Sequence, residues 1–213
     1  MTPDEFVLAL RRAGASAILR TSDTDAARRA MEAAVEGGFR VIEFTLSIPG
    51  ALELVAEFSR RDALVVGAGT VLTVDEARRA VDAGARFLVS PVVDEAVIEE
   101  AGRLGVASMP GASTPSEMLR AYRAGAPLQK LFPGPAGGPT WVRHTLGPLP
   151  FLRIVPTSGV TLDNAAEFLR AGAFAVGFVA SLFDPRDLAA ARYDAIRQRA
   201  ERMLQAVRSV RAA

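Results

Sequence analysis

The sequence predicts a single (β/α)8 barrel with an N-terminal helix, formed as one domain over residues 1–213. Short apolar segments rich in β-branched residues alternate with amphipathic helical segments, a pattern typical of parallel βαβ units. Small-residue steps such as Ala83-Gly84-Ala85 recur where a helical segment gives way to the next strand. The segment after the first strand, Thr21-Ser22-Asp23-Thr24, has no glycine, whereas an open dinucleotide-binding sheet would carry a Gly-rich loop there. These observations favour the closed barrel over an open sheet.

The first four repeats begin and end at recognisable signals. Thr2-Pro3 opens the N-terminal helix, Thr24 or Asp25 is expected to cap the next, and Gly37-Gly38 stops it. Pro49 opens the third helix, and Asp75-Glu76 begin the fourth. The predicted strands are residues 15–20, 40–44, 63–67 and 86–89, and the predicted helices are residues 4–13, 24–36, 49–60 and 75–84.

The second half of the chain repeats the alternation and closes with one long Arg-rich helix. The predicted strands are residues 106–109, 128–132, 152–155 and 174–177, and the predicted helices are residues 94–104, 115–124, 139–146, 162–171 and 187–210. Arginine pairs such as Arg28-Arg29 and Arg60-Arg61 indicate solvated helix faces.

The composition excludes several classes of function. The formal charge is +1, which argues against nucleic-acid binding. The chain has no cysteine and one histidine, so neither a disulfide framework nor a thiolate or multi-histidine metal site is expected. No apolar run is long enough to cross a bilayer, and the acidic N-terminus does not resemble a secretory signal. We therefore expect a soluble cytoplasmic protein with no membrane partner and no metal or cofactor.

Lys130 is the most informative single residue. Lysine and arginine together number 25, and Lys130 is the only lysine among them. It lies in the apolar run before Pro133, which reads as a buried strand and its carboxyl end. Unlike arginine, a buried lysine can lose its proton and act as an amine nucleophile toward a carbonyl group. The alternative is a lysine at a strand end that extends to solvent.

Other polar residues also fall at predicted strand ends, where barrel enzymes build their active sites. Glu43 lies between Ile42 and Phe44 in a buried strand, so its carboxylate needs a partner or a raised pKa. Arg20 either faces this mouth or simply faces water. The other residues at strand ends are Thr70, Pro91, Thr157, Ser158 and Gly159.

These residue types suit the chemistry of a 2-keto acid. A neutral Lys130 amine would form an iminium with the keto group, and Glu43 would move the protons. Arg20 and the Thr70 hydroxyl would suit the substrate carboxylate, because charge-assisted hydrogen bonds fix orientation. Burial favours the neutral amine and a nearby Glu43 carboxylate favours the charged one, so the resting protonation state stays open.

Several motifs resemble those of the 2-keto-3-deoxy-6-phosphogluconate (KDPG) and 4-hydroxy-2-oxoglutarate (KHG) aldolase family, which also includes 2-keto-3-deoxy-6-phosphogalactonate aldolases. The resemblance runs in order along nearly the whole chain. The motifs are Val41-Ile42-Glu43-Phe44-Thr45-Leu46, Val66-Gly67-Ala68-Gly69-Thr70-Val71-Leu72, Ser90-Pro91, Pro110-Gly111, Lys130-Leu131-Phe132-Pro133 and Pro156-Thr157-Ser158-Gly159-Val160.

The resemblance implies a metal-free class I aldolase that releases pyruvate and an aldehyde, such as glyceraldehyde 3-phosphate or glyoxylate, and that forms a homotrimer. It assigns Lys130 as the Schiff-base lysine and Glu43 as the acid and base. It places Thr70 and the Pro91 backbone at the pyruvate carboxylate. Thr157 falls at the position linked to stereochemical preference.

The sequence departs from the family pattern at two places. Gluconate-type members have an arginine where this chain has Ser47, whereas galactonate-type members have one at the position of Arg20. Family members usually hold the distal phosphate with Gly-Gly after strand seven and Gly-Ser after strand eight. Here those pairs are Ser158-Gly159 and Val179-Ala180.

A valine where a backbone must approach phosphate is a poor fit. This mismatch predicts weakened phosphate recognition and a shorter or unphosphorylated substrate, such as 4-hydroxy-2-oxoglutarate. Two rivals remain. A phosphate-sugar epimerase on the same barrel would need metal-binding histidines. A non-catalytic trimeric homologue would not need to retain both Lys130 and Glu43.

Overall fold

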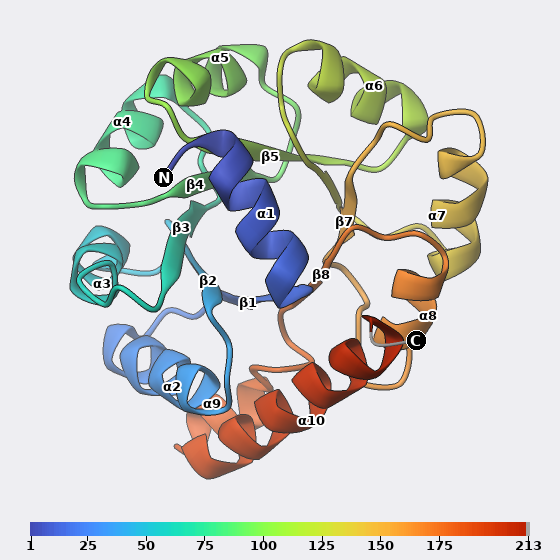
Figure 1. Ribbon diagram of the computed structural model, residues 1–213. Coiled ribbons are helices and arrows are strands. Elements are labelled where there is room, and N and C mark those ends of the chain that lie inside the picture. The colour runs from blue at the N-terminus through green and yellow to red at the C-terminus, as the bar shows by residue number, and fades with distance from the viewer. Residues whose placement is uncertain (212–213) are drawn as a thin grey trace.

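The computed structural model describes residues 1–211; residues 212 and 213, the end of the predicted domain, lie outside that part. Eight parallel strands form one sheet in the order β7-β6-β5-β4-β3-β2-β1-β8. The two outer strands approach each other where the Phe174 amide donates a hydrogen bond to the Ile154 carbonyl at 2.8 Å. The result is a nearly closed barrel surrounded by helices, which confirms the predicted fold class (Figure 1).

The strands are short and alternate with helices throughout. The strands are β1 (Ala15–Leu19), β2 (Val41–Thr45), β3 (Val65–Gly69), β4 (Phe87–Ser90), β5 (Ala107–Ala112), β6 (Gln129–Leu131), β7 (Ile154–Pro156) and β8 (Val176–Phe178). The helices are α1 (Pro3–Ala13), α2 (Thr24–Glu36), α3 (Ala51–Phe58), α4 (Val74–Asp82), α5 (Glu95–Arg103), α6 (Pro115–Arg123), α7 (Gly138–Leu146), α8 (Ala165–Arg170), α9 (Pro185–Ala189) and α10 (Tyr193–Arg211). In residues 1–211, none of these helices is both long and apolar enough to cross a membrane.

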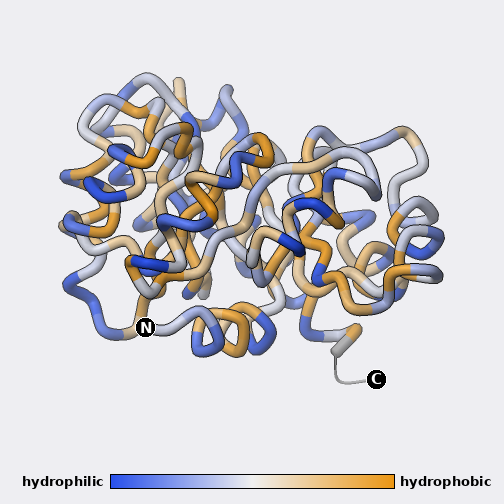
Figure 2. Tube along the Cα trace, turned by 90° about the horizontal axis from the view of Figure 1, so that it is seen from above, coloured by the Kyte–Doolittle hydropathy of each residue, from blue (hydrophilic) through white to orange (hydrophobic). Residues whose placement is uncertain are grey.

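Helix α1 closes the end of the barrel at which the strands begin. A capping box between Thr2 and Glu5 starts the helix, and Gly14 ends it in the left-handed conformation. The buried face of α1 contributes Phe6, whose ring stacks on Phe87 inside the barrel with 4.3 Å between centroids. The helix lies across the barrel in Figure 1 and forms a separate layer below it in Figure 2. The opposite end is therefore the only open mouth that the described residues leave.

The hydrophobic residues form two main cores. The larger one fills the space between the strands and the surrounding helices. The smaller one lies inside the barrel under α1 and includes Val41, Leu128, Val155 and Ala175. Because side chains alternate across a strand, the residues two positions further along face the same interior, nearer the mouth.

Glycines at helix ends start the next strand, as the small-residue steps predicted. Gly38, Gly84, Gly125 and Gly172 follow α2, α4, α6 and α8 and have φ values of 109°, 106°, 98° and 100°. A side chain at such a φ is strained, whereas glycine adopts it freely. These glycines reverse the chain within a few residues and so bring each strand back into the sheet.

The structure corrects several sequence predictions, among them a helix cap, the extent of a helix and the end of a strand. Asp23, rather than Thr24 or Asp25, caps α2, because its side chain accepts the Ala26 amide. The predicted helix over residues 187–210 is two helices, α9 and α10, separated where Ala191 has a φ of 51°. Strand β3 runs on to Gly69 instead of ending at Gly67, because its backbone continues to pair with Thr45 of β2.

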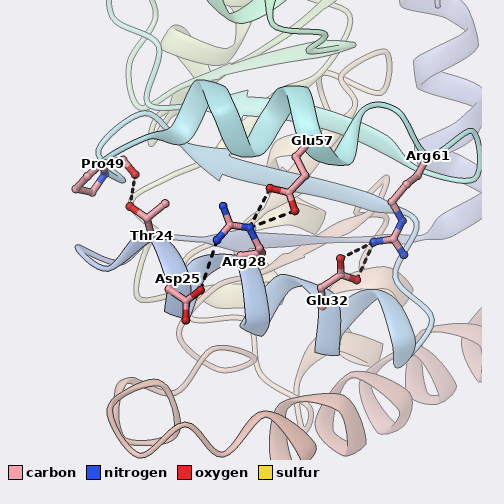
Figure 3. A network of polar contacts seen from close by, with 7 residues as sticks. All are labelled: Thr24, Asp25, Arg28, Glu32, Pro49, Glu57 and Arg61. Carbon is pink, nitrogen blue, oxygen red and sulfur yellow. Dashed lines mark hydrogen bonds and ion pairs between the residues drawn. The ribbon is translucent and has the colours of Figure 1, made fainter.

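Helices α2 and α3 are joined by a polar network on their outer surface (Figure 3). Arg28 forms an ion pair with Glu57 at 2.9 Å, and Arg61 forms one with Glu32 at 2.7 Å. Arg28 lies on the surface of α2 as predicted, whereas Arg61 lies beyond the end of α3 at Phe58 and not on a helix face. The Thr24 hydroxyl donates a hydrogen bond to the Pro49 carbonyl at 2.6 Å, which fixes the β2–α3 connection beside the start of α2.

We expect Phe6→Ala to lower the free energy of unfolding by about 3–5 kcal/mol, because it empties the space between α1 and Phe87. Urea denaturation monitored by circular dichroism measures this change. Leu8→Ala is the matched control, since Leu8 is on the same helix and 53% exposed; its effect should stay within about 0.5 kcal/mol. Equal effects of the two substitutions would contradict the role of α1 as a buried plug.

Candidate active site at the barrel mouth

Glu43 and Lys130 both face the interior of the barrel above its apolar core. Glu43 lies two residues after Val41, and Lys130 lies two residues after Leu128; both of those apolar side chains belong to the core under α1. In the sheet, Glu43 pairs with Ile18 of β1 and with Gly67 of β3. Lys130 pairs with Gly111 of β5 and Val155 of β7. The two residues therefore project into the same interior from strands far apart in the sequence.

The Glu43 side chain occupies space that is free because residue 69 is a glycine. A Cβ atom added to Gly69 would lie 1.9 Å from Glu43 Oε1 and 2.7 Å from its carboxyl carbon. No real side chain tolerates such contacts, so any residue larger than glycine at position 69 would displace the carboxyl group. Glu43 is fully buried, and neither of its carboxyl oxygens has a hydrogen-bond partner among residues 1–211. Buried carboxyl groups without partners are rare in folded proteins and mark candidate functional groups.

Burial shifts the pKa of both catalytic candidates toward the neutral form. It raises the pKa of Glu43, and the positive charges of Lys130 and Arg20 oppose this rise. Burial also lowers the pKa of Lys130; Glu43 opposes this shift and Arg20 reinforces it. The Lys130 side chain is inside the barrel wall, with only 7% of the residue exposed, which rules out the alternative of a lysine extending to solvent.

Arg20 bends back toward the site although it is exposed. Its guanidinium donates a hydrogen bond to the Thr70 hydroxyl at 3.2 Å, which joins the ends of β1 and β3. Thr70 has a φ of 60°, a left-handed conformation uncommon for a residue other than glycine. Backbone strain of this kind clusters at functional sites. Arg20 therefore faces the mouth rather than only water, as one of the two sequence readings expected.

Thr157 faces the barrel interior from the end of β7. It follows Val155 by two residues, is buried, and its hydroxyl has no hydrogen-bond partner. A Cβ atom on Gly177 would lie 2.7 Å from the Thr157 methyl group, so this glycine allows β8 to approach β7 closely. The neighbouring residues Ser158 and Gly159 are half-buried and exposed, and Gly159 has a φ of 73°.

The remaining candidates are at the rim. The Pro91 carbonyl would lie 2.4 Å from a Cβ on Gly111, so the end of β4 packs directly against β5. Val179 and Ala180 line a hollow of about 440 Å³ together with Arg20. Pro91, Ser158 and Gly159 do not line this hollow. The ten predicted site residues thus lie in three places. Glu43, Lys130 and Thr157 are buried inside the barrel, and Pro91, Ser158 and Gly159 are at the rim. Val179, Ala180 and Arg20 line the hollow, and Arg20 contacts Thr70.

The sequence did not predict some residues that shape the site. Gly69 was noted only as part of a motif, although its missing side chain makes room for Glu43. The alternation of Gly67 and Gly69 on the inward face, beside a strand with a long inward carboxylate, was a signal for this role. Ser16 was not singled out, yet its hydroxyl is buried without a partner. The hollow beside Arg20 had no sequence signal of its own.

Comparison with known proteins identifies the family. A family model described as KDPG and KHG aldolase matches residues 8–199. The chain belongs to this family. It is therefore a lyase of the KDPG/KHG aldolase type. A structural relative, the KDPG aldolase of Legionella pneumophila with pyruvate captured at low pH as a covalent carbinolamine intermediate, has a TM-score of 0.82 and 25% identity, over 92% of this chain and 96% of that one.

Sequence relatives of equal identity carry different substrate names. A probable 2-dehydro-3-deoxy-6-phosphogalactonate aldolase of Rhizobium meliloti (strain 1021) is 37% identical over 173 residues, which are 79% of this chain and 81% of that protein. A 2-dehydro-3-deoxy-phosphogluconate aldolase of Treponema pallidum (strain Nichols) is also 37% identical, over 139 residues, which are 64% of this chain and 66% of that protein. The comparisons thus show the family, while the substrate has to be argued from the site.

The raised pKa of Glu43 predicts a pH-dependent stability difference between the wild type and Glu43→Gln. The folded state binds the carboxyl proton more tightly than the unfolded state, so wild-type stability falls as pH rises above the ordinary glutamate pKa of about 4.5. We expect Glu43→Gln to gain stability relative to wild type between pH 4 and pH 8. Urea denaturation across this range measures it. A difference that shrinks with rising pH would contradict the assigned direction of the shift.

Proposed function

We propose that this protein is a class I aldolase that cleaves a 4-hydroxy-2-oxo acid to pyruvate and an aldehyde. Lys130 is the nucleophile and Glu43 the general acid and base. The observation that carries the proposal is the burial of the only lysine of the chain in the barrel mouth, where it interacts electrostatically with a buried carboxyl group that has no hydrogen-bond partner within residues 1–211. The pyruvate carbinolamine of the Legionella relative supports it, because a carbinolamine is the adduct of an amine and a keto group.

The first step joins the substrate to Lys130. The neutral amine attacks the C2 keto carbon, and the keto oxygen takes up a proton to give a carbinolamine. Loss of water, with a proton supplied by the Glu43 carboxyl group, gives an iminium. The lowered pKa of Lys130 favours the attacking amine, and the raised pKa of Glu43 favours the carboxyl form that donates a proton. Both shifts therefore favour this step.

The second step breaks the bond between C3 and C4. The Glu43 carboxylate, now without its proton, accepts the proton of the C4 hydroxyl, and C4 becomes the aldehyde carbonyl carbon. The electron pair of the broken bond moves into the iminium and gives an enamine. Protonation of the enamine at C3 and addition of water at C2 release pyruvate and restore the amine.

Arg20 and Thr70 are suited to the substrate carboxylate. Their hydrogen bond joins the ends of β1 and β3, the two strands that flank β2 and its Glu43. A carboxylate beside the guanidinium would receive charge-assisted hydrogen bonds, which fix orientation. The positive charge of Arg20 also lowers the pKa of Lys130, so it contributes to the neutral amine. The homotrimer implied by the family resemblance forms part of this proposal.

Borohydride reduction in the presence of pyruvate tests the nucleophile. We expect a single reduced pyruvate adduct, located at Lys130 by peptide mass spectrometry, because the iminium is reduced to a stable secondary amine. Lys130→Arg should give no adduct, since arginine keeps its proton. Glu43→Gln should slow adduct formation by about 10²- to 10⁴-fold, the usual contribution of a general acid or base.

The chain makes this experiment unambiguous, because it has no second lysine that could react. Wild-type protein that forms no adduct at Lys130 would refute the proposal and would favour the non-catalytic homologue.

Arg20→Gln tests the carboxylate site. Loss of a charge-assisted hydrogen bond costs about 1.5–3 kcal/mol, so we expect the KM for pyruvate in the aldol direction to rise by about 10- to 100-fold, with a smaller change in kcat. Arg12→Gln is the matched control, because Arg12 is an exposed arginine of α1 at the closed end of the barrel. An unchanged KM for pyruvate in Arg20→Gln would exclude Arg20 from the carboxylate site.

A further inference from the structure

The hollow beside Arg20 is formed by two connections at the barrel mouth. Residues 18–26 supply one wall, and residues 179–189 supply the other. Its volume of about 440 Å³ lies within the range of small-molecule sites, about 300–1,000 Å³. Eight of its twelve lining residues are apolar, among them Phe183, Leu188 and Ala189. The hollow is thus mainly an apolar surface at the mouth of an enzyme with a polar interior.

The hollow adjoins the catalytic residues. Ile18 lines it and pairs in the sheet with Glu43 on the neighbouring strand. Arg20 lines it and contacts Thr70 across the mouth. A substrate attached to Lys130 with its carboxylate at Arg20 would therefore lie beside the hollow.

Charges around the hollow disfavour a phosphate group. The Asp23 side chain lines the hollow and accepts the Ala26 amide at 2.9 Å, so a carboxylate already occupies the start of α2. Asp184 accepts the Arg186 amide at 2.8 Å at the start of α9. The helix starts that border the hollow are thus capped by anions, and a phosphate there would meet like charge. The one cation in the lining is Arg20, which the proposed function assigns to the substrate carboxylate.

One carbonyl and one hydroxyl of the β8–α9 connection form hydrogen bonds within the protein. The Val179 carbonyl accepts the amides of Leu182 and Phe183 at 3.0 and 2.8 Å. The Ser181 hydroxyl donates to the Val160 carbonyl at 2.6 Å, so it is directed to the β7–α8 connection. This wall of the hollow presents mainly apolar side chains to a ligand.

We propose that this hollow binds the distal tail of the aldehyde half of the substrate and takes an uncharged, largely apolar tail rather than a phosphate monoester. The inference rests on the proposed aldolase function and adds the substrate class. The tail lies against Phe183, Leu188 and Ala189, where burial of its carbon atoms provides the affinity. The bond between C3 and C4 breaks in cleavage and forms in the aldol direction.

The aldol direction tests the proposal with defined aldehydes. The enzyme is given pyruvate with pentanal, whose tail reaches the hollow, with acetaldehyde, which has no such tail, or with glyceraldehyde 3-phosphate. We expect kcat/KM for pentanal to exceed that for glyceraldehyde 3-phosphate by at least tenfold. An equal or higher kcat/KM for glyceraldehyde 3-phosphate would overturn the proposal.

A substitution that fills the hollow adds a second test. Ala189→Phe places a ring in it, so the ratio of kcat/KM for pentanal to that for acetaldehyde should fall at least tenfold. Ala190→Phe is the matched control, because Ala190 is the next residue and does not line the hollow. Ala180→Phe fills the hollow from another position on the same wall and replaces Ala189→Phe if that variant does not fold. An unchanged ratio in a folded filling variant would overturn the proposal.

A charge substitution tests the exclusion of phosphate. Asp23→Asn keeps a residue that caps helices well and removes the negative charge. The ratio of kcat/KM for glyceraldehyde 3-phosphate to that for acetaldehyde should rise at least threefold. Asp94→Asn, which changes the cap of α5 away from the hollow, should leave this ratio unchanged. A ratio that does not rise in Asp23→Asn would overturn the electrostatic part of the inference.

Borohydride trapping with pyruvate, run on the same preparations, separates the two proposals. An adduct at Lys130 together with a preference for glyceraldehyde 3-phosphate would overturn the apolar subsite and leave the aldolase function standing. Absence of the adduct would refute the aldolase function itself.

Discussion

The electrostatic interaction of Lys130 with Glu43, away from water, is the constraint on which the site depends. An ionised group that is buried without partners is strongly disfavoured, so each residue shifts its pKa toward neutrality. Both shifts favour the form with a neutral amine beside a carboxylic acid. This is also the form that begins an attack on a keto group. The same burial that destabilises the charged residues therefore prepares them for the reaction.

The barrel supports this pair by dividing its interior into two halves. Below, α1 and the apolar core exclude water from the closed end, with Phe6 stacked on Phe87. Above, Gly69 leaves room for the Glu43 carboxyl group and Gly111 lets the ends of β4 and β5 approach closely. Two strands thus carry glycine near the mouth, where a side chain would clash with a carboxylate or a backbone carbonyl. Glycine-containing strand ends and a bulky apolar floor together place the buried side chains of Glu43 and Lys130 above the core.

The sequence predicted those parts of the structure that depend on local patterns. Alternating strands and helices, glycine steps and the single lysine placed eight strands and the two catalytic candidates correctly. It did not predict features set by contacts between distant residues. Asp23 caps α2 because the chain turns there after β1, a choice among several capping residues that the sequence left open. The break between α9 and α10 has no proline or glycine to mark it; it follows from contacts of Asp187 with Arg192 and Arg199.

Those contacts explain how the wall of the hollow is held independently of the catalytic pair. Asp187 is buried, and Arg199 and Arg192 hold the pKa of its carboxyl group below the usual range. Arg199 also donates to the Leu182 carbonyl, which fixes the connection between β8 and α9. Lys130 and Glu43, by contrast, are positioned by β6, β2 and the glycine of β3. Because the two sets of supports share no residue, changes in the β8–α9 wall can alter the tail that fits without disturbing the chemistry at Lys130. In this chain the β8–α9 wall presents mainly apolar side chains, and two relatives of equal identity are named for two different phosphorylated sugar acids.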